Sequence, residues 1–312
     1  MNQKNKWLVR KTALAKTFKL KKGIKVDADS YLKTLSLLKI CYPYNHWWSW
    51  RDFTKNSIYP FHAIKPVFSY ASLNSYLECP YKYKLKNYIG LREERSLSLV
   101  IGSAYHEIMK NFFKEGNGDF SWERLAGIIN KVFKEIEFEF EFLRKATIIK
   151  ALGDFKRYFD SCFPFSALKI LTEKKFRFEL DGNGVAGRVD QINFLEGDII
   201  EIVDFKSGLK KITDSFLENE IQLRLYRLAV DLSPEMKFLR NYKSILKYIF
   251  LGDEGEQVYK LSDEFYDYED TINFLRSLIG DIKNEKFEAE PQSSYLCVDC
   301  DFKIVCPNKN TG

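Results

Sequence analysis

Residues 175–208 read KFRFELDGNGVAGRVDQINFLEGDIIEIVDFKSG, and the fold class is predicted from this segment. Three runs in it alternate between apolar and polar residues or are continuously apolar, as β-strands do. The sequences DGNG and EGD separate the runs and supply the glycine and aspartate that tight turns favour. The stretch therefore predicts an antiparallel meander of three strands.

Two carboxylates in this meander are candidates for chemistry. Asp190 lies near the centre of the second strand and Asp204 at the end of the third, where they can come level and point to one face. Such a pair repels itself unless a divalent cation lies between, and Mg²⁺ or Mn²⁺ suits oxygen ligands. Lys206 lies on the same face as Asp204 and could orient or help deprotonate a water. The plain alternative is a solvated strand end that happens to carry Asp and Lys.

Helices are predicted on both sides of the meander. Apolar residues recur at helical spacing over 98–115, with His106 at the edge of the stripe, and long helices follow over 121–162. A helix over 215–231 carries Gln222 and Tyr226 on one face. Strands near 243–251 and 256–261 and a helix over 262–285 complete the chain. Taken alone, His106 is more often structural at such a position, and Gln222 and Tyr226 could be an ordinary polar edge.

Four cysteines suggest a second site. Cys79 directly precedes Pro80, which interrupts a short helix, and the last three form a C-x2-C-x5-C pattern of Cys297, Cys300 and Cys306. Four thiolates suit a 4Fe-4S cluster or a zinc site, and disulfides are the third interpretation. A single site of this kind would tie residue 79 to residue 306, so the region between them should fold as one unit. Cys41 and Cys162 lie outside the pattern and are interpreted as free thiols.

The composition is that of a soluble globular protein, with 45% hydrophobic and 29% charged residues among 312. No apolar run approaches the roughly 20 residues that span a bilayer, and no secretory signal is recognisable, so we expect no membrane association and a reducing cytoplasm. The chain has no GxxxxGK[ST] phosphate-binding loop, so any ATP-driven motor of that type would be a separate protein.

Residues 1–65 are predicted to be an extension to a main domain over 66–312. The first 26 residues hold nine basic residues and no acid. This arm could neutralise phosphates or could be a solvated tail. The aromatic residues that follow could stack single-stranded bases or pack the extension onto the main domain: Tyr42, Tyr44, Trp47, Trp48, Trp50 and Phe53.

The ordered set of motifs resembles the RecB-like exonuclease branch of the PD-(D/E)XK nuclease superfamily. The set consists of His106, Asp190, Asp204-x-Lys206 and Gln222-x3-Tyr226. The local sequences around Ser72-Leu73, Tyr76–Tyr81 and Gly102-x3-His106-Glu107 are similar too. The split cysteines resemble those of iron–sulphur members, which include the AddB nuclease domain and the CRISPR-adaptation exonucleases. The resemblance covers about residues 67–308.

This resemblance implies an α/β, restriction-endonuclease-like core with a mixed central sheet flanked by helices. It implies that His106, Asp190, Asp204 and the carbonyl of Phe205 bind the catalytic Mg²⁺ or Mn²⁺. Lys206 would position the attacking water, and Gln222 and Tyr226 would hold the substrate or the wall of the active site. Glu173 is a weaker candidate. For the cysteines the resemblance favours a 4Fe-4S cluster over zinc.

The activity implied is metal-dependent hydrolysis of DNA, by an exonuclease of single strands or DNA ends in repair, recombination or CRISPR adaptation. A helicase or CRISPR-adaptation proteins are the expected partners. One alternative is a non-cutting DNA-binding or structural subunit of a larger helicase–nuclease complex. A second is a nuclease subunit of a larger repair or CRISPR-adaptation complex that is active only beside a helicase or integrase.

Overall fold

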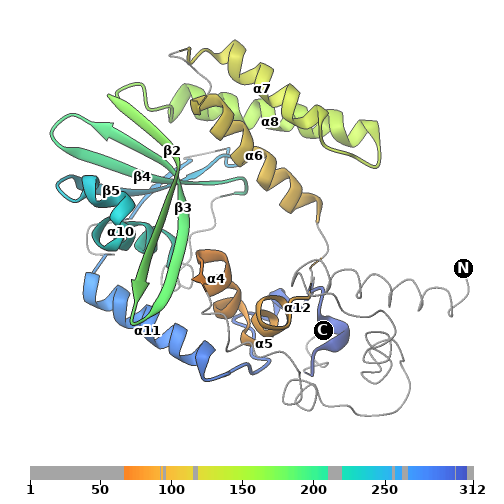
Figure 1. Ribbon diagram of the computed structural model, residues 1–312. Helices are drawn as coiled ribbons and strands as arrows, with labels where there is room; N and C mark the ends of the chain where they lie inside the picture. The colour runs from red at the N-terminus through yellow and green to blue at the C-terminus, as the bar shows by residue number, and fades with distance from the viewer. Residues whose placement is uncertain are drawn as a thin grey trace, which may run out of the picture. The chain divides into compact units, whose positions relative to one another are not determined.

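The computed structural model describes residues 67–91, 93, 96–114, 119–209, 220–254, 257–261, 266–298 and 300–307. The predicted extension over 1–65, with its basic arm, its aromatic residues and Cys41, lies outside these residues. The chain forms two compact units (Figure 1). Unit 1 comprises the described parts of 71–94 and 280–312, and unit 2 comprises 67–70 and the described parts of 95–279.

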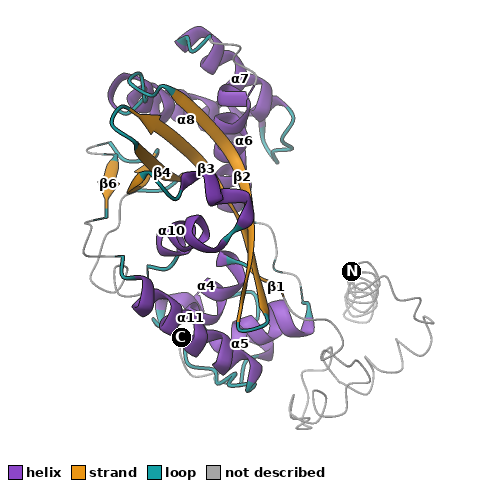
Figure 2. Ribbon diagram, turned by 60° about the vertical axis from the view of Figure 1, so that its left-hand side comes forward, coloured by secondary structure: helices purple, strands orange, loops and turns teal. Residues whose placement is uncertain are grey.

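Unit 2 is built on a six-stranded mixed sheet. The antiparallel meander predicted from the sequence is present as β2 (Lys169–Leu180), β3 (Asn183–Leu195) and β4 (Ile199–Lys206). Figure 2 shows β2 and β3 as one long twisted ribbon. The short strand β1 (Val67–Phe68) pairs in parallel with the start of β3.

Two further strands extend the sheet beyond β4. The strand β5 (Lys243–Phe250) pairs with β4 in parallel, and β6 (Val258–Lys260) pairs with β5 antiparallel. A parallel neighbour needs a crossover connection, and α10 (Gln222–Leu232) with the 3₁₀ turn η3 (Pro234–Leu239) lies within it.

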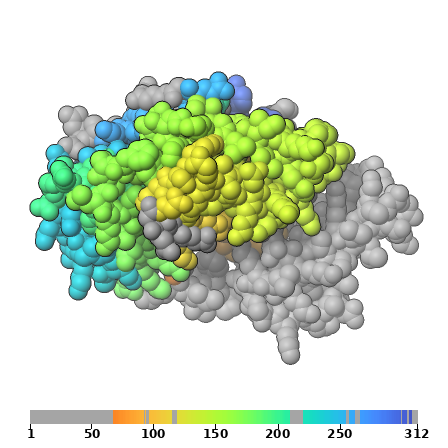
Figure 3. Space-filling model, turned by 90° about the horizontal axis from the view of Figure 1, so that it is seen from above, coloured from red at the N-terminus to blue at the C-terminus, as the bar shows by residue number. Residues whose placement is uncertain are grey.

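Helices cover both faces of this sheet. Against one face pack α6 (Leu97–Lys114), α7 (Trp122–Lys134) and α8 (Glu141–Ser161), whose apolar side chains share a core with Val203 and Phe205 of β4. In Figure 3 these three helices, yellow to yellow-green, form a continuous surface. The residues alternating with Val203 and Phe205 face the other way, toward α10. The predicted mixed sheet flanked by helices is therefore confirmed.

The boundary of α10 differs from the predicted helix over 215–231. The helix begins at Gln222, and residues 210–219 are outside the described part. The carboxylate of Glu220 accepts a hydrogen bond from the amide of Leu223 at 2.8 Å. Because this side chain satisfies a free amide of the first turn, it sets the start of the helix. The last long helix, α11 (Tyr268–Lys283), lies inside its predicted range.

Unit 1 joins segments from the two ends of the described chain. The first contributes most of α4 (Tyr70–Glu78), then α5 (Pro80–Tyr83) and the π-helix η2 (Lys84–Ile89). The second contributes the end of α11, α12 (Tyr295–Val298) and the 3₁₀ turn η5 (Lys303–Val305). Backbone hydrogen bonds link the segments: the amide of Tyr81 donates to Glu288 and that of Gln292 to Glu78. Tyr76, Tyr83 and Phe287 pack their rings together between them.

Candidate active site

The two candidate aspartates stand opposite each other where β3 and β4 part. The antiparallel register runs up to Gln191 opposite Val203, so the next positions are Asp190 and Asp204, as the tight turn predicts. At this point the backbone amide of Phe205 donates to Oδ2 of Asp190 at 3.0 Å. A side chain therefore takes the place of the next ladder bond, and the pairing of β3 with β4 ends here, while β3 stays paired with β2.

Asp204 is almost completely buried, with 1% of the residue exposed. Its Oδ1 accepts hydrogen bonds from the Gln222 amide and from the Tyr226 hydroxyl. The Lys206 ammonium lies 2.8 Å from Oδ2, an oxygen that accepts no well-aligned hydrogen bond from the described residues. Burial raises the pKa of this carboxyl to about 6, since Lys206 offsets only part of the desolvation and Asp190 adds to it.

Gln222 connects the residues around Asp204. Its Oε1 accepts from Lys206 at 2.5 Å, and its Nε2 also contacts the Tyr226 hydroxyl at 2.9 Å. Burial alone would lower the pKa of Lys206, but the charge of Asp204 raises it overall. The sequence predicted site residues at one strand end and on one helix face. These four residues form a single hydrogen-bonded group: Asp204, Lys206, Gln222 and Tyr226.

Gly187, in the sequence GRVD before Asp190, makes room for this group. A Cβ at this position would lie 2.5 Å from the ring of Phe176, which crosses directly over the glycine. The same ring packs edge-on against Tyr226, with centroids 6.1 Å apart. Phe176 can support Tyr226 from this position only because residue 187 has no side chain.

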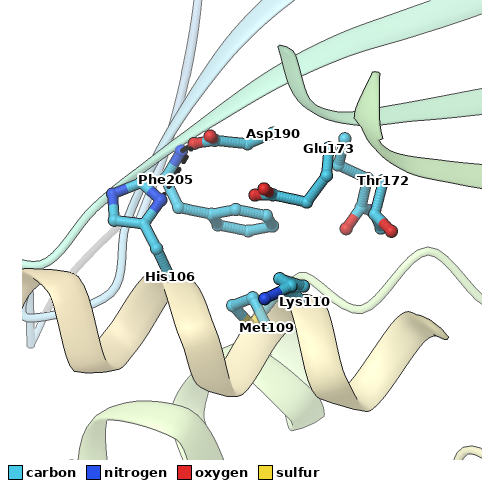
Figure 4. Close-up of a pocket in the computed structure, with 8 residues that line it drawn as sticks. His106, Met109, Lys110, Thr172, Glu173, Asp190 and Phe205 are labelled. Atoms are coloured by element: carbon cyan, nitrogen blue, oxygen red, sulfur yellow. Dashed lines mark hydrogen bonds and ion pairs between the residues drawn. The ribbon is translucent and has the colours of Figure 1, made fainter. Parts of the chain in front are cut away.

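His106 reaches the site from α6. Its Nδ1 lies 3.2 Å from Oδ2 of Asp190, and Figure 4 shows the ring pointing from the helix toward that carboxylate. Burial would lower the pKa of His106, but the hydrogen bond and charge of Asp190 raise it overall. A Cβ at Gly102 would be 3.2 Å from Oγ of Ser207, so the glycine one turn earlier lets α6 approach the end of β4 closely.

A small cavity lies beside His106 and Asp190. Phe205 and Glu173 line it as well (Figure 4). The N–H and C=O of one strand residue point to the same side, so the Phe205 carbonyl points where its amide does, toward Asp190. Glu173 has a positive φ of 56°, pairs with Arg188 at 2.5 Å, and has a pKa raised by burial.

Sequence reasoning missed three residues around Lys206. Tyr70 and Tyr248 place their rings beside its ammonium, and Glu220 bonds the Tyr248 hydroxyl. No local pattern marks them, because their positions depend on contacts between distant segments. The parallel pairing of β4 with β5, for example, sets Tyr248 opposite Asp204.

The four patterned cysteines gather in unit 1. Three of them pack against a cluster formed by Tyr81, Leu85 and Phe302: Cys79, Cys300 and Cys306. The fourth, Cys297, lies close enough to Cys300 to contribute to the raised pKa of that thiol. Backbone amides of Lys82 and Tyr81 donate to the thiol of Cys79, although burial raises its pKa overall. Cys162 lies elsewhere, in unit 2, where its thiol donates to Oε1 of Gln257 at 3.6 Å, and no described cysteine forms a disulfide.

In the described part of the chain, no three His, Cys, Asp or Glu side chains are arranged to hold one metal ion. The carboxylates are instead engaged by His106, Lys206 and Gln222. Among the same described residues, no helix is both long and apolar enough to cross a bilayer.

The sequence profile of the PD-(D/E)XK nuclease superfamily matches residues 67–307. The chain belongs to this superfamily. Its mixed sheet with helices on both faces is consistent with the restriction-endonuclease-like fold, and the chain is accordingly a nuclease by family.

A curated relative from Clostridium acetobutylicum is one of the subunits of an ATP-dependent helicase/deoxyribonuclease. The two are 28% identical over an alignment of 204 positions, and the match covers 52% of this chain but 17% of the relative. Among solved structures, one is of a Eubacterium rectale protein that is provisionally named an exonuclease. It is 15% identical to this chain with a TM-score of 0.48, and the match covers 82% of this chain and 92% of the Eubacterium rectale chain. The protein SSO0001 is 16% identical with a TM-score of 0.32, over 74% of this chain and 95% of its own.

Proposed function

We propose that this nuclease is a metal-dependent DNA exonuclease that acts on single strands or DNA ends. The observation that carries the proposal is the buried Asp204, whose Oδ2 accepts no well-aligned hydrogen bond from the described residues and whose pKa is raised by burial. A buried carboxylate that is costly to ionise fits a site that a cation completes.

The donor set suits Mg²⁺ or Mn²⁺, which prefer oxygen ligands. Asp190 and Asp204 would supply carboxylates, Phe205 its carbonyl and His106 its imidazole. When bound, the cation would polarise the scissile phosphate and stabilise the charge that develops on it.

The remaining residues act on the water and on each other. Lys206 would orient the attacking water and offset charge on the phosphate, while Gln222 holds the ammonium and carboxylate in fixed relation. Tyr226, bonded to Asp204 and Gln222, would form the wall beside the substrate. No side chain in this group needs to become a covalent nucleophile.

The four cysteines support a 4Fe-4S cluster, with zinc as the alternative. All four lie in unit 1, and the thiol of Cys79 is within electrostatic reach of Cys300 and Cys306. Amides donating to a ligand sulphur are typical of such clusters. The cluster would join the helices around Cys79 to the last described residues of the chain.

The testing experiment is cleavage of end-labelled single- and double-stranded DNA by anaerobically purified protein, with Mg²⁺, Mn²⁺ or chelator. Asp204→Ala should abolish cleavage, whereas Asp160→Ala, which removes an exposed carboxylate paired with Lys156, should not. If Asp204→Ala cut DNA at the wild-type rate, this active site would be wrong.

A second candidate is a non-cutting subunit of a helicase–nuclease assembly in DNA repair. The similarity to one component of a helicase/deoxyribonuclease favours a helicase partner. DNA binding without cleavage by folded, cluster-loaded protein that co-purifies with a helicase would support this candidate.

A further inference from the structure

The ammonium of Lys206 lies over two tyrosine rings. Its Nζ is 5.0 Å from the ring centroid of Tyr248 and 5.5 Å from that of Tyr70. Both distances fall within the range at which a ring face attracts a cation. Tyr248 is 1% exposed, so this attraction acts where little water competes with it.

Tyr248 is held in place by a residue outside the catalytic group. Its hydroxyl donates to Oε1 of Glu220 at 2.6 Å. The same oxygen accepts from the amide of Leu223 at 2.8 Å and so fixes the first turn of α10. That turn carries Gln222, whose Oε1 accepts a hydrogen bond from the Lys206 ammonium. Glu220 therefore links the ring beside Lys206 to the helix that positions the amide.

We propose that Tyr70 and Tyr248 form an aromatic cage that positions the Lys206 ammonium for the reaction, with Glu220 anchoring the cage. This inference rests on the proposed nuclease function. The three residues are positioning residues, because each acts through Lys206 rather than on DNA. A lysine side chain has several rotatable bonds, and the cage restricts them so that the ammonium stays beside Asp204.

The first part of the test is kinetic, and its variants remove the tyrosine rings and the Tyr248 hydroxyl separately. Tyr248→Leu and Tyr70→Leu should each lower kcat on the order of tenfold, with KM for DNA unchanged, because the lysine that the rings position acts in the transition state. Tyr248→Phe keeps the ring and should retain more activity than Tyr248→Leu. The matched control is Phe238→Leu, which removes a ring 5.3 Å from the Lys174 ammonium, outside the site.

The second arm does not depend on cleavage. In protein labelled at lysine with ¹³C, the ε-methylene signal of Lys206, assigned with Lys206→Arg, should be shifted upfield by the two rings. Tyr70→Leu and Tyr248→Leu should each remove part of that shift.

The outcomes separate the two proposals. The wild-type protein could fail to cut DNA while its Lys206 signal is shifted and each tyrosine-to-leucine substitution reduces that shift. In that case the nuclease proposal fails, and the cage is present but has no role in cleavage. An unshifted Lys206 signal would overturn the cage whatever the activity. Leucine variants with wild-type kcat, or with a raised KM alone, would overturn its positioning role.

Discussion

Replacing Asp204 by Asn should stabilise the cation-free protein while abolishing cleavage. Burial raises the pKa of this carboxyl from 3.8 to about 6. One pKa unit corresponds to about 1.4 kcal/mol, so ionised Asp204 costs the folded state roughly 3 kcal/mol at pH 7. Asn removes that charge and keeps an oxygen for the hydrogen bonds from Gln222 and Tyr226.

The sign follows from proton binding. Since the folded protein binds this proton more tightly than the unfolded chain, wild-type stability should decrease as pH rises through the window from 3.8 to about 6. The gain from Asp204→Asn should therefore be present at pH 7.5 and absent near pH 4. The assay is urea denaturation with EDTA at both pH values, on wild type and variant loaded with the same cluster.

A buried aspartate in a different setting provides the control. Asp154 is 1% exposed and accepts from Tyr105, Lys150 and Arg157. Its replacement by Asn weakens two ion pairs, so Asp154→Asn should destabilise the protein at pH 7.5, the opposite sign. If Asp204→Asn proved no more stable than wild type at pH 7.5, the carboxylate would not be under electrostatic strain, and our reasoning about the site would be refuted.

Three other perturbations test separate parts of the structure. Gly187→Ala should place a methyl group against the ring of Phe176 and lower the stability of the protein by about 1–3 kcal/mol. Because that ring packs against Tyr226, the variant should also have a lower kcat. An unchanged kcat and an unchanged denaturation midpoint would contradict this prediction. Cys300→Ala should lower bound iron and the melting temperature, whereas Cys162→Ala should leave the iron content unchanged; full iron in Cys300→Ala, by metal analysis, would exclude this ligand. EDTA should stop cleavage without altering the far-UV circular dichroism, and cleavage that persists in EDTA would argue against metal dependence.

Local patterns were sufficient for the centre of the fold. Alternation and two turns predicted the meander. The short turn between β3 and β4 predicted that Asp190 and Asp204 come level, and the paired register ends one position before them, at Gln191 opposite Val203. The helical spacing likewise placed Gln222 and Tyr226 on one face, where both bond Asp204.

The parts that sequence reasoning missed depend on contacts between distant segments. The strand β1 has two residues, too few to show a period, and is formed by pairing with β3. The first turn of α10 is bonded by Glu220, which lies one position before the N-cap residue Ile221 and accepts from the amide of Leu223. Tyr70 and Tyr248 reach Lys206 through tertiary packing alone. The roles assigned to all these side chains remain predictions.

The composition of unit 1 from an early and a late segment has a consequence for synthesis on the ribosome. Residues 71–94 leave the exit tunnel well before residues 280–307, which supply the hydrogen-bonding partners of Tyr76 and Tyr81. The segment between them contains nearly the whole of unit 2, which can start to fold while translation continues. Of the two described units, unit 1 therefore begins with the earlier helix, α4, and is completed last. A chain that ended before residue 280 would leave α4 without these partners and open to chaperones and proteases.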